Sequence, residues 1–200
     1  MVIEVDLIIR NIKEVLTCHA DEPKRGKALN ELNIRRHCAI AIKDGRFLSI
    51  KSEKELLDKY SAKEIIDAKG GIILPGFVDP HTHIVYAGNR LDEFEQKISG
   101  ADYLEILASG GGILSTVKQT REASLDNLTA QSFNRLCKMI QSGTTTCEVK
   151  TGYGLSTRDE LKMLKVIEKL YQLSKIDIVP TLLAAHAMPK EFASKRESYI

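Results

Sequence analysis

The chain has 200 residues, of which 43% are hydrophobic and 28% are charged, and its formal net charge is +2. This is the composition of an ordinary globular protein, and the interleaved acids and bases give no basic patch of the kind that binds nucleic acid. No apolar run approaches the roughly 20 residues that span a bilayer, and the acidic start does not resemble a secretion signal. Because the four cysteines form no C-x-x-C motif, they fit a reducing compartment. We therefore expect a cytoplasmic protein that binds neither nucleic acid nor a membrane.

Residues 1–70 predict a small antiparallel β-domain. Apolar and polar residues alternate over residues 5–9, as in a half-buried strand. Asp44-Gly45 lies between two β-rich runs, and this dipeptide favours a type I′ hairpin turn. A short helix at residues 53–60 and a further strand near residues 65–67 follow. Such a domain is marginal by itself, so we expect another element to cover one of its faces.

From residue 71 onward strands alternate with helices, which predicts parallel βαβ units. Strands are expected at residues 72–79, 144–149 and 177–184, and helices at residues 103–108, 124–142 and 157–173. A capping box at Thr157 to Glu160 is expected to open the last helix. A (β/α)₈ barrel needs about 250 residues, so these steps predict an incomplete TIM-type barrel over residues 71–200. The fold class is thus α/β, and we expect the N-terminal part of a longer protein or a truncated product.

The first of these strands is predicted to be buried and leads into His81-Thr82-His83. Alternate side chains on a strand share a face, so Asp79, His81 and His83 should lie on one side. Two neutral imidazoles at this spacing form half of a site for zinc, iron or nickel. A bare H-x-H pair is more often a chance pair of histidines that bind no metal. The apolar residues 71–74, Pro75-Gly76 and Asp79 before the pair favour a metal site here. Asp79 either orients a histidine or forms a turn beside Pro80.

Further motifs accompany this strand, at residues 75–83, 87–90, 110–117, 120–123, 143–145, 150–155, 160–164 and 185–189. With them the chain resembles the imidazolonepropionase family of the amidohydrolase superfamily over residues 71–190, and more loosely over residues 1–70. The resemblance implies metal-dependent hydrolysis of 4-imidazolone-5-propanoate to N-formimidoyl-L-glutamate in histidine degradation. It implies one divalent metal ion, zinc or iron, and a small-molecule substrate that carries a propanoate group. It also allows a homodimer of the full-length protein.

The resemblance also implies roles for individual residues. It assigns His81 and His83 to the metal, and Arg90, Tyr153 and His186 to the substrate. The other metal ligands and the general acid/base come from later barrel strands in the family. The catalytic residues are therefore unknown in this chain and are expected in a C-terminal half.

The chemistry of these residues leaves alternatives open. Arg90 follows the metal strand, where the loops of a barrel build active sites, and a guanidinium can grip a carboxylate with two parallel bonds. Tyr153 lies between glycines that let the loop approach a ligand, although a turn with a half-buried tyrosine fits equally well. His186 is a substrate contact, a spare metal ligand or a structural histidine. Lys150 ends the second strand, where we expect it to support the structure.

Two other functions are open on sequence grounds. A deaminase or a dihydropyrimidinase-like amidohydrolase would share the same metal strand. The chain would instead be an inactive fragment if it needs its C-terminal half, because only two metal ligands are evident where a catalytic zinc site usually has three.

Overall fold

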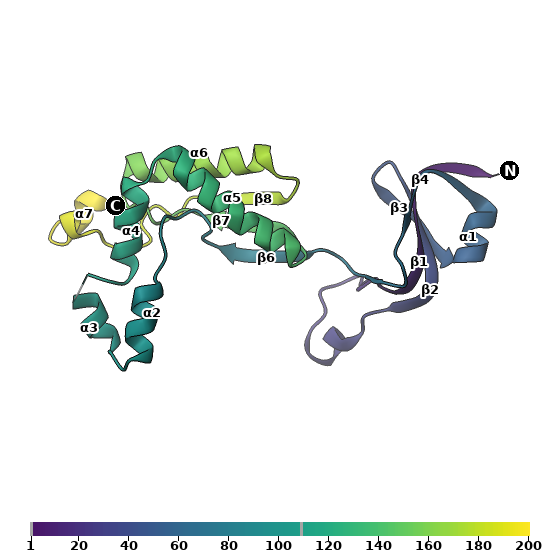
Figure 1. Cartoon of the computed structure of the whole chain (residues 1–200), viewed down its shortest axis with the longest axis horizontal. Coiled ribbons are helices and arrows are strands. Elements are labelled where there is room, and N and C mark those ends of the chain that lie inside the picture. The colour runs from purple at the N-terminus through teal and green to yellow at the C-terminus, as the bar shows by residue number, and fades with distance from the viewer. Residues whose placement is uncertain (1, 109) are drawn as a thin grey trace. The chain divides into compact units, whose positions relative to one another are not determined.

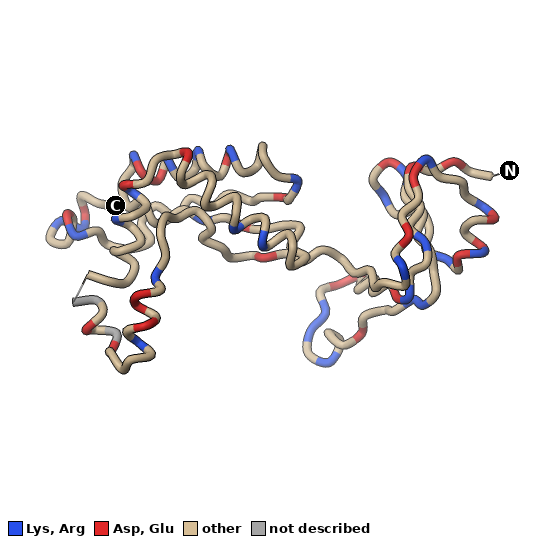
Figure 2. Tube along the Cα trace, in the orientation of Figure 1, with Lys and Arg blue, Asp and Glu red and all other residues tan. Residues whose placement is uncertain are grey.

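The computed structural model describes residues 2–108 and 110–200 and divides the chain into two compact units, Met1–Pro75 and Gly76–Ile200 (Figure 1). The first unit holds a five-stranded sheet and the second holds a three-stranded sheet. Basic and acidic residues are interleaved along the chain in both units (Figure 2). Within the described residues no helix is both long and apolar enough to cross a membrane.

The first unit contains the predicted hairpin. Strand β1 (Ile3–Leu16) pairs antiparallel with β2 (Ile34–Lys43), which pairs antiparallel with β3 (Arg46–Ser52). Asp44 and Gly45 join β2 to β3 with φ values of 51° and 70°. Positive φ at both central positions is the requirement of a type I′ turn, so the Asp-Gly signal is confirmed.

The rest of this sheet differs from the predicted antiparallel arrangement. Strands β4 (Tyr60–Asp67) and β5 (Ile72–Ile73) both lie parallel to β1, so the sheet is mixed. Helix α1 (Glu53–Lys59) lies between β3 and β4. Because the chain passes through this helix and not through a tight turn, β4 can join the sheet in the parallel direction. The sequence pattern shows strands but not their direction.

Helix α1 covers part of this sheet with a fully buried leucine. Leu56 lies in a core cluster with Val5, Ile8, Ala39, Ala41 and Tyr60. A second buried cluster contains Ile12, Val15, Cys38 and Ile40. The only other regular element of this unit that the structure describes is a short 3-10 helix, η1 (Gly26–Asn30).

The second unit confirms the predicted parallel strands. Its sheet has the order β6-β7-β8, formed by Phe77–Thr82, Thr144–Lys150 and Asp177–Thr181, with both pairs parallel. Helices α5 (Leu125–Gln141) and α6 (Thr157–Leu173) lie beside this sheet (Figure 1). Their apolar faces share one core with the sheet, including Leu128, Leu136, Cys147, Val149, Met163, Val166, Ile167, Leu170 and Ile178. Closure into a barrel stays a prediction.

The strand predicted at residues 72–79 is wrong in extent and in burial. Its first residues form β5 of the other sheet, and β6 begins only at Phe77. Phe77 and Val78 are 54% and 65% exposed. The cause is the position of β6, which pairs with β7 alone and is an edge strand of this sheet. An apolar run cannot show whether a second neighbour covers it.

In its described residues, the connection from β6 to β7 contains three helices before α5. The sequence predicts the middle one, α3 (Tyr103–Ala108), but misses α2 (Leu91–Ile98) and α4 (Ile113–Glu122). Helix α2 has Leu91, Phe94 and Ile98 at helical spacing, but no residue of it is buried and these three are exposed, so its short pattern was overlooked. Two of the three buried residues of α4 are threonines, which a search for apolar periodicity overlooks.

The start of α6 also differs from the sequence prediction. The side chain of Ser156, and not of Thr157, accepts a hydrogen bond from the backbone N–H of Asp159 at 3.2 Å and caps the helix. Glu160 therefore takes no part in a capping box and is buried with 3% exposure. Strand β8 ends at Thr181, so the segment that carries His186 is a loop. Short elements η2 (Lys190–Phe192) and α7 (Arg196–Tyr199) follow this loop.

Candidate functional site

Four of the five predicted site residues meet near the carboxyl ends of the three parallel strands. The ring centroid of His83 lies 5.5 Å from that of His81, 5.1 Å from that of Tyr153 and 5.0 Å from that of His186. His81 of β6, His83 directly after it, the loop after β7 and the loop after β8 each contribute to this cluster. Since the carboxyl ends of parallel strands lie at one edge, residues far apart in sequence converge there.

His83 has the properties of a metal ligand. Burial lowers its pKa, and the neighbouring His186 and His81 lower it further. The imidazole is therefore neutral at neutral pH, which is the form that binds metals. Its Nδ1 atom is buried and has no hydrogen-bond partner among the described residues. His81 and His83 thus fit two of the nitrogen ligands that zinc prefers. Across residues 2–108 and 110–200, no group of three or more His, Cys, Asp or Glu is placed to hold an ion.

Other polar side chains beside the histidines are engaged within the sheet. Asp79 Oδ1 accepts a hydrogen bond from the backbone N–H of His81 at 3.3 Å, within β6 and where the register with β7 shifts between Asp79 and Thr82. Glu148 accepts hydrogen bonds from the ammonium of Lys150 and from the hydroxyl of Thr181. These contacts, with a smaller effect from His81, lower the pKa of Glu148. The sequence analysis did not identify Glu148; Lys150 lies on the same strand, and Thr181 becomes its neighbour only when β7 pairs with β8.

Arg90 opens onto a cavity shared with Tyr153. The cavity has a volume of about 410 Å³ and is lined by Tyr86, Asn89, Arg90, Leu91, Thr116 and Tyr153. The guanidinium of Arg90 pairs with Glu93 at 2.6 Å, and the other oxygen of Glu93 accepts the backbone N–H of Gly112 at 2.9 Å. Glu93 of α2 thereby holds the Arg90 side chain at the wall of the cavity.

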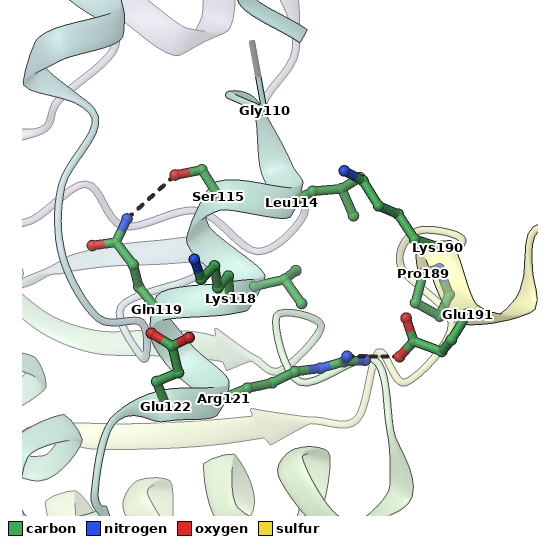
Figure 3. Close-up of a pocket in the computed structure, with 11 residues that line it drawn as sticks. Gly110, Leu114, Ser115, Lys118, Gln119, Arg121, Glu122, Pro189, Lys190 and Glu191 are labelled. Carbon is green, nitrogen blue, oxygen red and sulfur yellow. Dashed lines mark hydrogen bonds and ion pairs between the residues drawn. The ribbon is translucent and has the colours of Figure 1, made fainter. Parts of the chain in front are cut away.

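A larger cavity, of about 730 Å³, lies between α4 and residues 189–191 (Figure 3). It contains none of the predicted site residues. Its wall includes Arg121, whose guanidinium pairs with Glu191 at 2.6 Å (Figure 3). The smaller cavity, in contrast, contains two of the residues predicted to bind substrate, and its Tyr153 lies beside His83.

Tyr153 connects that cavity to the histidine cluster. Burial raises the pKa of Tyr153, although Arg90 opposes the shift. The phenol therefore keeps its proton at neutral pH and is available as a hydrogen-bond donor. The ring also contacts Tyr86 edge-on, with centroids 6.3 Å apart.

The glycines on either side of Tyr153 let the loop approach other parts of the protein closely; the sequence suggested an approach to a ligand. A Cβ on Gly152, which has φ of +114°, would lie 2.8 Å from Cβ of His186. A Cβ on Gly154 would lie 2.5 Å from the backbone nitrogen of Glu160. Real Cβ atoms do not approach so closely, so the loop after β7 fits between the loop after β8 and the start of α6 only because these positions are glycines.

Three buried or half-buried side chains from helices hold the loops of the site, and the sequence analysis missed all three. Glu160 accepts hydrogen bonds from backbone N–H groups of the loop after β7. Arg121 donates hydrogen bonds to backbone carbonyl groups of the same loop. Arg135 of α5 donates to the carbonyl oxygens of Ile84 and Tyr86 at 3.0 and 2.8 Å, just after His83. Their partners are backbone atoms, which leave no signal in a sequence.

No family model matches the chain. Curated relatives do match it over nearly its whole length. The imidazolonepropionase of Thermoanaerobacter pseudethanolicus is 46% identical over 197 residues, which are 98% of this chain and 47% of the relative. Those of Clostridium tetani and Myxococcus xanthus are 42% and 43% identical, each again over 98% of this chain and 47% of the relative. The chain thus spans about half the length of the curated relatives that it matches.

Solved structures with a similar fold include a triazine hydrolase and an adenosine deaminase. A triazine hydrolase of Arthrobacter aurescens has a TM-score of 0.54 at 15% identity, covering 88% of this chain and 35% of that protein. An adenosine deaminase from Xanthomonas campestris with bound zinc has a TM-score of 0.54 at 11% identity, covering 91% of this chain and 43% of that protein. At such low identity the likeness concerns the fold alone.

Proposed function

Because this chain is related over 98% of its length to imidazolonepropionases, we propose that it forms part of an enzyme that hydrolyses 4-imidazolone-5-propanoate to N-formimidoyl-L-glutamate. The structural observation that supports this proposal is the convergence of His81, His83, Tyr153 and His186 at one edge of the parallel sheet. A histidine pair with a neutral, half-buried member, next to a cavity with an arginine, suits a metal-dependent hydrolase of an anionic substrate.

We assign His81 and His83 to a single divalent metal ion, zinc or iron. When bound, such an ion supplies the Lewis acidity that makes water a nucleophile at neutral pH. The zinc-containing deaminase of similar fold is in keeping with this assignment. We do not assign the general acid/base to a residue of this chain.

The residues of the cavity divide the remaining work. Arg90 binds the propanoate, because a guanidinium offers two parallel N–H groups to a carboxylate. The Tyr153 hydroxyl donates a hydrogen bond to the ring part of the substrate from the half-buried position between Arg90 and His83. His186, in the loop after β8, is the third substrate contact, and its ring stacks on that of His83 at an angle of 28°.

The assay that tests this function uses the full-length enzyme with 4-imidazolone-5-propanoate and follows the loss of the imidazolone absorbance. We expect turnover with this substrate and little with aminated purines or dihydropyrimidines, which lack the propanoate that Arg90 is placed to bind. Faster release of ammonia from an aminated purine, or faster opening of a dihydropyrimidine, would favour another amidohydrolase activity and contradict the proposal.

Replacing Arg90 by alanine should weaken productive binding of the propanoate. A lost hydrogen bond to a charged group costs about 1.5–3 kcal/mol, so kcat/KM should fall by about 10- to 150-fold. Glu93 keeps its bond to Gly112 in this variant, so the loop should stay folded. Arg158→Ala is the matched control, because Arg158 is exposed on α6 and lines no part of this cavity. An analogue without the carboxylate should bind Arg90→Ala and the unmodified enzyme equally; if Arg90→Ala still discriminates between the two ligands, Arg90 is not the carboxylate site.

A further inference from the structure

Glu160 is a buried acidic residue that makes three hydrogen bonds to a single loop. Its Oε2 atom accepts the backbone N–H of Gly152 at 2.9 Å, and its Oε1 atom accepts those of Gly154 and Leu155, both at 2.8 Å. The side chain is 3% exposed. A carboxylate accepts hydrogen bonds at both oxygens and donates none, which suits it to collect three converging donors.

Arg121 of α4 holds the same loop by its carbonyl groups. Its guanidinium donates to the oxygens of Gly154 at 2.6 Å and Leu155 at 2.9 Å, and it also pairs with Glu191 (Figure 3). Leu155 is fully buried with φ of 49°, a conformation that a non-glycine residue adopts only when its surroundings impose it. The loop is therefore fixed through its N–H groups from α6 and through its carbonyl groups from α4.

The position of this loop also determines the position of the loop after β8. Gly152 is in contact with His186, as the 2.8 Å separation from a built Cβ shows. Next to Gly152, the Thr151 hydroxyl accepts the backbone N–H of Leu183 at 3.0 Å. A shift of residue 152 would thus displace both Tyr153 and His186, which face His83.

We propose that Glu160 is a positioning residue of this active site: its carboxylate fixes the backbone of residues 152–155 and so places Tyr153 and His186 against His83. This inference rests on the proposed function, since Tyr153 and His186 are the proposed substrate contacts. Glu160 touches neither ring and acts through the backbone alone. The substrate for which it preorganises the loop is the same small anionic cyclic amide.

Glu160→Gln is the sharpest variant, because it keeps the shape of the side chain. An amide oxygen can still accept from Gly154 and Leu155, but the amide nitrogen would point a donor at the N–H of Gly152. Asp159→Asn is the matched control on the same helical turn. Asp159 bonds Ser156 and Lys162 and makes none of the hydrogen bonds described here to residues 152–155.

The test is a double-mutant cycle in the full-length enzyme with Glu160→Gln, Tyr153→Phe and both together. We expect Glu160→Gln to lower kcat/KM by about tenfold or more, because small misplacements of substrate contacts are costly. In the Tyr153→Phe background the same change should cost much less, and Asp159→Asn should cost little in either background. Amide hydrogen exchange should become faster at residues 152–155 in Glu160→Gln but not in Asp159→Asn.

An equal loss in both Tyr153 backgrounds would overturn the placement of Tyr153 by Glu160. Unchanged exchange at residues 152–155 would overturn the whole proposal, because Glu160 would then not hold this loop. If Glu160→Gln does not give folded enzyme, Arg121→Met takes its place in the cycle, since methionine keeps a long side chain but donates no hydrogen bond to the carbonyl groups of Gly154 and Leu155. Hydrogen exchange needs no substrate. An enzyme that is inactive on imidazolone propanoate but shows the expected exchange pattern would therefore contradict the proposed function. It would still support the role of Glu160 in holding residues 152–155.

Discussion

Replacing His83 by alanine should remove the metal and nearly all activity from the full-length enzyme. His83 is the centre of the cluster, with the rings of His81, Tyr153 and His186 all within 5.5 Å. A catalytic zinc site usually has three protein ligands, so the loss of one leaves too few to retain the ion. His81→Ala should have the same effect, and the double variant should bind no metal after dialysis.

The measurement is metal content by atomic emission beside kcat/KM for each variant. His19→Ala is a suitable control, because His19 lies in the first unit and pairs on the surface with Asp21 at 3.8 Å. It should keep both metal and activity. Stoichiometric metal in the double variant would show that neither histidine is a ligand.

The elements that the sequence predicts well are those with a local signal. The Asp44-Gly45 turn needs only the positive φ that these two residues tolerate. Ser124 caps α5 through the backbone N–H of Asn127 at 3.2 Å, close to where the sequence places the helix start. Such signals depend on residues within one or two turns of each other, so a sequence is enough to find them.

The elements that it predicts poorly depend on distant neighbours. Whether β4 runs parallel or antiparallel to β1 is decided by the path of the chain through α1. Whether Phe77 and Val78 are buried depends on what lies next to β6, and the structure shows one neighbouring strand. Neither answer is contained in the hydrophobic pattern of the segment itself.

The candidate site follows the same division. The family resemblance selected His81, His83, Tyr153 and His186, and their places near the ends of predicted strands agreed with it, because parallel strands bring their carboxyl ends together. Glu160 was instead interpreted as part of a capping box, a local role that its side chain does not have. Side chains that hold a loop through its backbone can be recognised only when the loop and the helix are seen together.

Gly152→Val should reduce kcat/KM by about 100-fold, the scale on which a misplacement of about 1 Å affects catalysis. The new Cβ would lie 2.8 Å from Cβ of His186 and 3.1 Å from the carbonyl oxygen of Leu183. Both belong to the loop after β8, so that loop must move away from His83. The positive φ of +114° adds backbone strain of about 1–3 kcal/mol, which should also lower the thermal unfolding temperature.

Gly100→Val separates the two effects. Gly100 has a similar φ of +99°, but a Cβ there meets no atom of the described structure within 4 Å. It should therefore show comparable strain in thermal unfolding while kcat/KM stays close to that of the unmodified enzyme. The extra loss of kcat/KM in Gly152→Val, relative to Gly100→Val, then measures the displacement of His186. If His186 contacts the substrate, the double variant Gly152→Val with His186→Ala should recover none of the lost kcat/KM. Equal kcat/KM values for Gly152→Val and Gly100→Val would mean that the site does not require His186 beside His83.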